Sequence, residues 1–491
     1  MSSVERAPNI DPVLSSGAMK LRKKKLDNLP WDHSGRHPGN PIFWRVILLM
    51  LKVAWDYIFR RKQIDQLPPF EGGRILSSMH LNGLVDPLAI VFSQDRRIIT
   101  MGRHDLMTMP LVGWFARRMG SQPVIRRPEI KGGVSNEEYA VAINHRTLLT
   151  MTNCIAAGHN AVVMPEGKSH QDSRLHRFKT GPMRFGINAA AIASHRDAPL
   201  PALQPVGLHY RRHYWFRTDL YVEFPEPIPI PTPSDLELGR SLIEGKWVEP
   251  PSLQVNQLRE ELFDELSIIT PDAPDWQTHR AWHLMGHVRA LESGRRLENF
   301  REEVLAAREV RGLAVDGRIT EATVKVALQA AEILDSNGLD GRSLDAGGIR
   351  EDRPWLGCLV GLSLMVATAP VVIPSTGLQA AIAWYFGNRT DEGIDARTTY
   401  HMLAAMFSPV LFWPPLAICA AYFATGPGLA MLPIAAIAMF ITHLFNLVFL
   451  KGYDLWTEFD HSSRRIKLTS SSEYESLLEM LSETRSSLNL L

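Results

Sequence analysis

The sequence predicts an α/β domain, then a helical region, then a C-terminal α-helical membrane domain. Two observations lead to this fold class. Strand-like and helix-like segments alternate over residues 72–224, and two long stretches near the C-terminus contain no Asp, Glu, Lys or Arg. Alternating strands and amphipathic helices are typical of layered α/β folds. The 491 residues leave room for roughly two to four domains of ordinary size.

Composition excludes several classes of protein. The chain has 53 basic and 52 acidic side chains, a net charge of +1, and 45% apolar residues. This balance gives no support to a dedicated nucleic-acid binder, and the apolar fraction excludes disorder as the overall state. Three widely spaced cysteines exclude a disulfide framework and a cysteine-based zinc site. The N-terminus lacks the apolar core of a secretory signal.

Two segments precede the α/β domain. Residues 1–40 are expected to form a polar, basic N-terminal tail, whose lysine and arginine run at 20–25 either attracts anionic lipid headgroups or is simply solvated. Residues 41–71 are expected to form a membrane-interface helix and its lead-in. The apolar stretch 41–59 contains two tryptophans and ends at three basic residues, which favours the interface over a helix that only packs on the core.

Residues 72–231 are expected to form the α/β domain and residues 232–353 a helical region. The expected strands are 74–77, 97–101, 161–164, 203–208 and 219–223. The domain ends in a proline-rich segment at 224–234, where proline at every second position excludes a helix or a central strand. The helical region is expected to contain helices at 253–269, 276–297 and 322–336.

Residues 354–450 are expected to form a membrane domain of two helical hairpins, followed by a C-terminal tail at 451–491. Residues 355–386 and 398–450 lack charged side chains, and a spanning helix needs about 20 apolar residues. The longer stretch therefore holds two spans. The shorter one is too long for one span and short for two, with Pro370, Pro374 and Gly377 near its middle.

Basic residues flank both apolar stretches. If all of these groups face the cytoplasm, each stretch must cross the membrane an even number of times. The shorter stretch is therefore expected to be a re-entrant or short helical hairpin, and the longer one a two-span hairpin. Two such stretches are improbable as buried helices of a soluble bundle. The sequence thus predicts an integral membrane protein whose active site faces the cytoplasm.

His80 and Asp86 form the first candidate motif. The histidine follows a strand-like run, and Pro87 suits the first turn of a helix. If the loop folds back, Asp86 accepts a hydrogen bond from one imidazole nitrogen and leaves the other as a base for a substrate hydroxyl. Taken alone, the pair is as well explained by a capping aspartate beside a surface histidine.

Three further segments carry candidate residues. Glu166 and Gly167 follow a strand, where the carboxyl end of a sheet offers a ligand crevice, although a turn with a solvated glutamate looks the same. Arg126 and Arg127 follow another short strand, and guanidinium groups suit phosphate recognition; in isolation they are a surface charge pair. Residues 205–210 are expected to be a strand that packs in the core or lines an acyl-chain groove.

The order and spacing of these segments resemble the glycerolipid acyltransferase superfamily, with its His-(x)4-Asp, Gly…Arg, Phe-Pro-Glu-Gly and Val-Pro blocks. Five residues separate His80 from Asp86, and this longer form is similar to the yeast-type glycerol-3-phosphate/dihydroxyacetone-phosphate acyltransferases and their bacterial relatives. The stretch from Glu166 to His170 resembles the same branch. The sequence departs from the family at Met79, where an asparagine is usual, and at Met164, where a phenylalanine is usual. Neither change removes a group that transfers a proton. The resemblance covers roughly residues 40–450.

The resemblance implies an acyltransferase domain with a mixed sheet flanked by helices. It implies transfer of a fatty acyl group from acyl-CoA or acyl-carrier protein to glycerol-3-phosphate in phospholipid biosynthesis, with no cofactor and no metal. His80 is then the general base and Asp86 the carboxylate that orients it. The implied substrate-binding residues are Arg126, Glu166, Gly167, Ser169, Arg127 and Lys179.

Alternative functions stay open at this point. The acceptor can equally be 1-acyl-glycerol-3-phosphate (lysophosphatidate) or another lysophospholipid. A non-catalytic lipid-binding membrane protein is more remote, because a binding module needs no base such as His80. A lipid hydrolase with a Gly-x-Ser-x-Gly elbow is excluded because the motif is missing. The expected partners are the phospholipid bilayer, the glycerol-phosphate acceptor and the acyl donor, and the expected location is a bacterial inner membrane rather than the endoplasmic reticulum.

Overall fold

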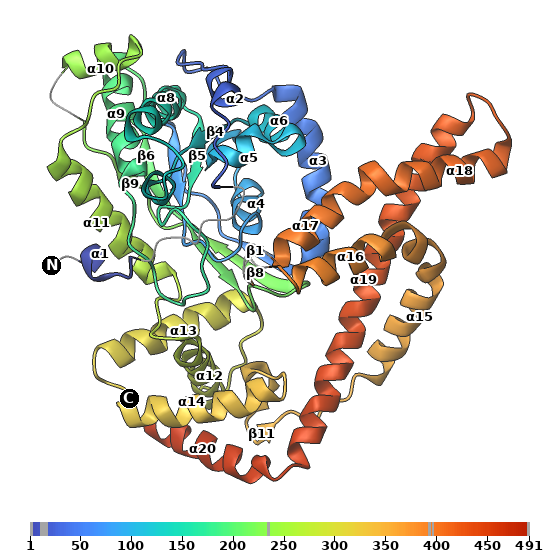
Figure 1. Ribbon diagram of the computed structural model, residues 1–491. Helices are drawn as coiled ribbons and strands as arrows, with labels where there is room; N and C mark the ends of the chain where they lie inside the picture. Colours follow the sequence, from blue (N-terminus) through green and yellow to red (C-terminus); the bar gives the residue numbers. More distant parts are fainter. Residues whose placement is uncertain (1–2, 10–17, 233–235, 391–393, 395–396, 489–491) are drawn as a thin grey trace.

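A computed structural model describes residues 3–9, 18–232, 236–390, 394 and 397–488 (Figure 1). Its α/β domain is built on a six-stranded sheet in the order β4-β3-β5-β2-β6-β9. The strands are β2 (Arg74–Ser77), β3 (Ile98–Arg103), β4 (Ser121–Val124), β5 (Asn160–Val163), β6 (Ala202–Pro205) and β9 (Ile228–Pro229). All neighbours are parallel except β6 and β9. The mixed sheet predicted from the sequence is therefore confirmed.

Helices cover both faces of this sheet, which explains why its central strands are apolar throughout. Ile75 and Leu76 of β2 are both fully buried, yet they belong to different cores. Ile75 packs with α8 (Glu137–Ala156), α9 (Gly181–His195) and α11 (Ser252–Ile269). Leu76 packs with α3 (Pro41–Ile58) and α4 (Val85–Val91) on the other face. Successive residues of a strand point to opposite faces, so a strand buried on both sides loses the polar alternation of an exposed one.

A second, three-stranded sheet has the order β1-β8-β7, with β1 at Phe59–Ile64, β7 at Gly207–Tyr210 and β8 at Thr218–Glu223. The strand expected at 203–208 is divided, because β6 ends at Pro205 and β7 begins at Gly207 in the other sheet. Between them, the Val206 amide donates to the Ser77 carbonyl at 2.8 Å. Strand β1 has no counterpart in the sequence analysis, since its basic sequence shows no apolar alternation.

The proline-rich segment contributes an edge strand as well as a connection. Ile228 and Pro229 pair in antiparallel fashion with Leu203 and Ala202 at the end of the sheet. Proline is tolerated there because an edge strand need not donate on both sides. The end of the segment, at 233–234, lies outside the described residues.

The helical region is built from α10 to α14: α10 (Leu236–Ile243), α11, α12 (Trp276–Glu292), α13 (Phe300–Val315) and α14 (Glu321–Ser336). Helix α12 ends five residues before the expected position 297, because Gly294 adopts a left-handed φ of +68°. Helices α12 to α14 share a separate hydrophobic core with α20 (Glu473–Leu488), so the C-terminal tail folds back onto this region (Figure 1).

Among the described residues, three helices are long and apolar enough to cross a membrane. They are Trp355–Gly387 (33 residues), Arg397–Thr425 (29 residues) and Met431–Thr469 (39 residues). The last two form the longer apolar stretch, joined at residues 426–430, with α18 (Trp413–Thr425) packed on α19 (Met431–Thr469). Helix α17 (Arg397–Phe407) begins this stretch and lies against α3.

The shorter apolar stretch is not a helical hairpin, which corrects the prediction from charge placement. It is one bent helix in which α15 (Trp355–Val372) lies along α19, while α16 (Leu378–Gly387) turns away along α17 (Figure 1). A π-helical turn at Ile373–Gly377 joins the two parts. Pro374 has no amide hydrogen, and the wider turn lets the helix bend without folding back on itself.

The basic N-terminal tail is partly packed on the α/β domain. Leu26 of α2 (Lys23–Asp27) is fully buried beside Ile125 and Ile143. Arg22 and Lys25 donate to the carbonyl oxygen of one residue, Thr108, at 3.1 and 3.3 Å. This segment is therefore anchored to the α/β domain, while the side chains of Arg22 and Lys25 stay exposed. The preceding positions 10–17 lie outside the described residues.

Candidate active site

The loop between β2 and α4 folds back so that His80 meets Asp86. Asp86 Oδ2 accepts from His80 Nδ1 at 2.9 Å and from the amides of Leu81 and Asn82 at 2.8 Å each. The Asp86 side chain is fully buried, while that of His80 is 16% exposed. Nε2 of His80 has no hydrogen-bond partner among the described residues. The geometry thus leaves one imidazole nitrogen available to a substrate.

Tyr210 is a further member of this site that the sequence did not reveal. Its hydroxyl donates to Asp86 Oδ1 at 2.7 Å, so both carboxylate oxygens of Asp86 are used. Burial, reinforced by the Asp86 carboxylate, raises the pKa of Tyr210 well above its usual value and keeps it a neutral donor. The sequence analysis placed Tyr210 in a core or groove strand, and nothing in a strand pattern indicates such a contact across the fold.

Glu166 holds the backbone of the loop that carries His80. It follows β5, and its Oε2 accepts from the amide of His80 at 2.9 Å. Its Oε1 accepts from the amide of His176 at 2.8 Å and from Nε2 of His170 at 2.9 Å. The residue is only 2% exposed. As placed, Glu166 positions His80, and a direct contact of this carboxylate with the acceptor stays a prediction.

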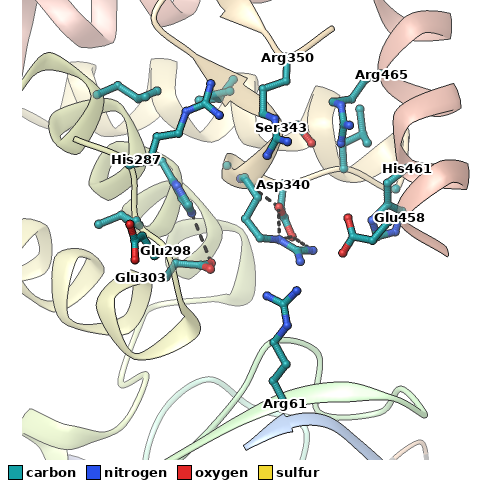
Figure 2. A pocket seen from close by; sticks show the side chains of 18 residues that line it. Arg61, His287, Glu298, Glu303, Asp340, Ser343, Arg350, Glu458, His461 and Arg465 are labelled. Carbon is teal, nitrogen blue, oxygen red and sulfur yellow. Dashed lines mark hydrogen bonds and ion pairs between the residues drawn. The ribbon is translucent and has the colours of Figure 1, made fainter. Parts of the chain in front are cut away.

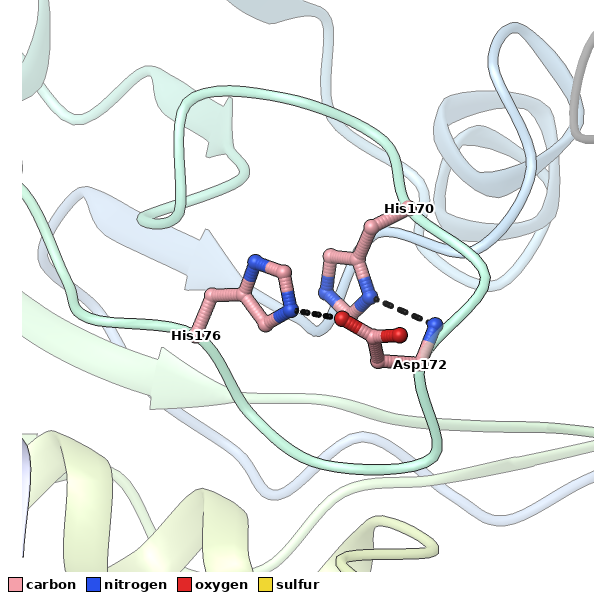
Figure 3. A group of neighbouring side chains, drawn as sticks. All are labelled: His170, Asp172 and His176. Atoms are coloured by element: carbon pink, nitrogen blue, oxygen red, sulfur yellow. Dashed lines mark hydrogen bonds and ion pairs between the residues drawn. The ribbon is translucent and has the colours of Figure 1, made fainter. Parts of the chain in front are cut away.

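His170, Asp172 and His176 form a compact group (Figure 3), and His170 bonds Glu166. Their ligand-type atoms lie within 4.8 Å of one another, and the two imidazole rings stack with centroids 3.8 Å apart. Both nitrogens of His170 are engaged, since Nδ1 accepts from the Asp172 amide at 3.2 Å and Nε2 donates to Glu166. His176 Nε2 bonds the Asp172 carboxylate. These contacts account for the group as a brace for Glu166, and we assign it no metal.

Gly167, Ser169 and Lys179 surround the turn that carries Glu166. Gly167 is exposed with a φ of +77°, a conformation that favours glycine. The stem of Lys179 lies 3.4 Å from the point where a Cβ on Gly167 would sit. Ser169 is half-buried in the same loop. All three therefore lie close to Glu166 in the fold, and their substrate contacts stay predictions.

Arg126 and Arg127 share the sheet edge with His80 but do not contact it. Strand β4 is three positions from β2 in the sheet, which corresponds to about 14 Å at the usual strand spacing. Arg126 bonds the buried Glu129 through Nε and Nη2, at 2.8 Å each. Its Nη1 has no hydrogen-bond partner among the described residues. Arg127 is exposed at the start of the short helix Arg127–Lys131.

The first turn of α17 touches the loop between His80 and Asp86. Thr398 is buried, and its hydroxyl donates to Asn82 Oδ1 at 3.0 Å. The amide of Leu84 donates to the hydroxyl of Thr399 at 3.3 Å. The beginning of a candidate membrane span therefore supports the loop that holds His80. More than 300 residues separate the partners in sequence, so no local pattern predicts the contact.

Comparisons with known proteins find similarity over the part of the chain that contains these residues. The family model described as Acyltransferase matches residues 59–202, which include His80, Asp86, Arg126 and Glu166. Glycerol-3-phosphate O-acyltransferase 2 of Saccharomyces cerevisiae is 28% identical over 120 residues, which are 24% of this chain and 14% of that protein. The chain therefore matches only a small part of this relative's length.

The crystal structure of the 1-acyl-sn-glycerophosphate (LPA) acyltransferase PlsC from Thermotoga maritima is similar over 44% of this chain and 79% of that one, at 15% identity and a TM-score of 0.27. The family match confirms the resemblance predicted from the motifs: residues 59–202 are similar to the Acyltransferase family, in line with the expected similarity to the glycerolipid acyltransferase superfamily.

Proposed function

We propose that the protein is a membrane-bound O-acyltransferase that moves a fatty acyl group to a hydroxyl of glycerol-3-phosphate in phospholipid biosynthesis. The acyl donor in this proposal is acyl-CoA or acyl-carrier protein. The observation that carries the proposal is the bonded pair of His80 and Asp86, 2.9 Å apart, with Nε2 of the histidine lacking a partner among the described residues. The proposal needs no metal and no cofactor.

The reaction requires one proton transfer in each direction. Nε2 of His80 takes the proton of the acceptor hydroxyl, and the hydroxyl oxygen attacks the thioester carbonyl carbon. The tetrahedral intermediate collapses, the carbon–sulfur bond breaks, and the imidazolium returns its proton to the leaving thiolate. Asp86 holds the imidazole in orientation and stabilises its charged form, while Tyr210 and two amides keep Asp86 in place.

Arg126 is proposed to bind the phosphate of the acceptor. Glu129 fixes its guanidinium at the carboxyl edge of the sheet and leaves Nη1 for a ligand. Burial alone would raise the pKa of Glu129, but His104, whose Nδ1 lies 3.3 Å away, and the hydrogen bonds from Arg126 lower it, so the pair stays ionised. An acceptor held there reaches toward His80 across the ends of β3 and β5. Lys179, Arg127, Ser169 and Gly167 are proposed as further contacts.

The α/β domain is proposed to dock on the same bilayer that its C-terminal helices cross. Helices α3 and α6 (Pro110–Met119) expose a row of large apolar side chains. The two helices contact each other through Phe43 and Trp114, whose ring centroids lie 5.2 Å apart. The exposed residues are Ile42 and Leu49 (72% each), Val46 (51%), Leu111 (82%) and Val112 (46%). Apolar surface beside exposed lysines and arginines suits an anionic membrane surface. The basic residues that flank the membrane helices favour the cytoplasmic face of the bilayer as the side on which the α/β domain lies.

Acyl transfer by the purified full-length protein in liposomes tests the proposal. Labelled palmitoyl-CoA is offered to glycerol-3-phosphate and to 1-acyl-glycerol-3-phosphate in parallel, and palmitoyl-acyl-carrier protein is the second donor. Product from glycerol-3-phosphate supports the proposal. Product from the lysophosphatidate alone replaces the acceptor with that compound. No product from either acceptor with either donor contradicts the proposed activity.

A further inference from the structure

A polar cavity lies away from His80, where the helical region, strand β1 of the three-stranded sheet and α19 meet. Its volume is about 170 Å³ (Figure 2). We call it the junction pocket; its charged lining residues are Arg61, Arg296, Arg342, Arg350, Arg465, Glu298, Glu303, Asp340 and Glu458. Figure 2 shows Arg61 reaching into it from one side and Glu458, His461 and Arg465 facing it from α19.

The acidic residues of the junction pocket are mostly committed to other arginines. The pairs are Glu303 with Arg211 (2.6 Å), Asp340 with Arg342 (2.8 Å) and Glu458 with Arg60 (2.5 Å). Neither Arg211 nor Arg60 lines the pocket. Arginines outside the cavity therefore neutralise Glu303 and Glu458, and Arg342 neutralises Asp340 within the lining itself.

In the described part of the chain, two arginines of the pocket have no such match, and a third, Arg465, is only partly paired. Arg61 and Arg296 have no ion pair among the described residues. Arg465 is 7% exposed in its side chain; its Nη2 bonds Asp352 at 2.9 Å, but its Nε is buried without a hydrogen-bond partner. A buried donor left unpaired is costly, and guanidinium groups converging from three separate elements suit the oxygens of a phosphate.

We propose that the junction pocket binds a phosphate-bearing ligand. The phosphate belongs either to a lipid headgroup or to a soluble phosphate compound. A headgroup is within reach because Lys451 ends the apolar stretch of α19, and Glu458 to Arg465 lie about 10 to 20 Å further along the helix. The binding is independent of the acyl transfer proposed above, since neither His80 nor Arg126 lines the cavity.

Isothermal titration of the full-length protein in uncharged detergent tests this site. A His80→Ala background removes turnover, so the result does not depend on the proposed activity. The probes are inorganic pyrophosphate and dihexanoyl phosphatidic acid, each at constant ionic strength. The test variant combines Arg61→Gln and Arg296→Gln, whose side chains hold no structural ion pair. Arg295→Gln is the matched control, because Arg295 is an exposed neighbour outside the pocket.

At least one probe is expected to bind saturably. Removal of two charged donors should weaken that binding at least about tenfold, and Arg295→Gln should leave it unchanged. Tighter binding of the phosphatidic acid identifies a headgroup as the ligand, and tighter binding of pyrophosphate identifies a soluble phosphate. Absence of saturable binding for both probes, or equal affinity in the double variant and the control, overturns the proposal.

Discussion

At the scale of single residues, the site is a set of hydrogen bonds that leave very little freedom to His80. Its imidazole is fixed by Asp86, and its backbone is fixed by Glu166. Asp86 in turn is held by Tyr210 and by two loop amides. A general base must lie within hydrogen-bond reach of the proton it removes, so small errors in its placement cost rate.

Tyr210→Phe tests this positioning role. The variant removes one hydrogen bond to a carboxylate but keeps the ring, so kcat should fall about 10-fold while KM stays nearly constant. Tyr139→Phe is the control, because its exposed hydroxyl lies far from Asp86 in the N-terminal contact with Asp27. Unchanged kcat in Tyr210→Phe would show that the two amides suffice to hold Asp86.

At the scale of elements, the sequence predicted the strands near the site better than it predicted the contacts between them. Strand β2 lies at the expected 74–77, and the helix at 253–269 is α11 within one residue. Long apolar and amphipathic segments are determined locally, so their patterns can be read directly. The basic strand β1 and the division of 203–208 between two sheets depend on pairing with β8 and β2, which no local pattern records.

The support that α17 gives to the loop carrying His80 leads to a second prediction. Thr398→Val keeps the shape of the side chain but removes the donor to buried Asn82. The loss of this contact should lower acyl transfer about 3- to 10-fold in protein that inserts normally. Thr425→Val is the matched control, because that hydroxyl bonds only within its own end of α18. Equal rates for the two variants would show that α17 does not position the loop.

Strand β8 provides a prediction on stability in acid. Burial alone would raise the pKa of Glu223, but hydrogen bonds from His209 and Arg308 lower it to about 2. A depressed carboxyl pKa stabilises the folded state above the unfolded value of roughly 4.3, and this contribution disappears as pH falls toward 2. It amounts to about 3 kcal/mol at neutral pH.

Glu223→Gln should therefore lower the thermal unfolding midpoint at pH 7 more than at pH 3. Glu261→Gln, an exposed position on α11, should show no such difference. The measurement is the midpoint in detergent at pH 7, 5 and 3. A loss in Glu223→Gln that is the same at all three pH values would contradict the low pKa.

At the scale of the whole molecule, the candidate site residues were accessible from sequence because they occupy short motifs. His80, Asp86 and Glu166 come together at one edge of the sheet, where parallel strands end side by side. Arg126 lies on the same edge but two strands beyond β5, a separation that motif order does not specify. The charge rule failed for the shorter apolar stretch because a proline-containing π turn bends the helix instead of reversing it.

The central claim is that His80 acts as the base for acyl transfer to a glycerol-phosphate hydroxyl. The most direct test compares initial rates of labelled acyl transfer in liposomes for the wild-type protein, His80→Ala and His195→Ala. His195 is an exposed histidine at the end of α9 and serves as the control. The account predicts that His80→Ala alone loses about 10²- to 10⁴-fold in rate, with normal membrane insertion. A His80→Ala rate equal to that of the wild type would contradict it.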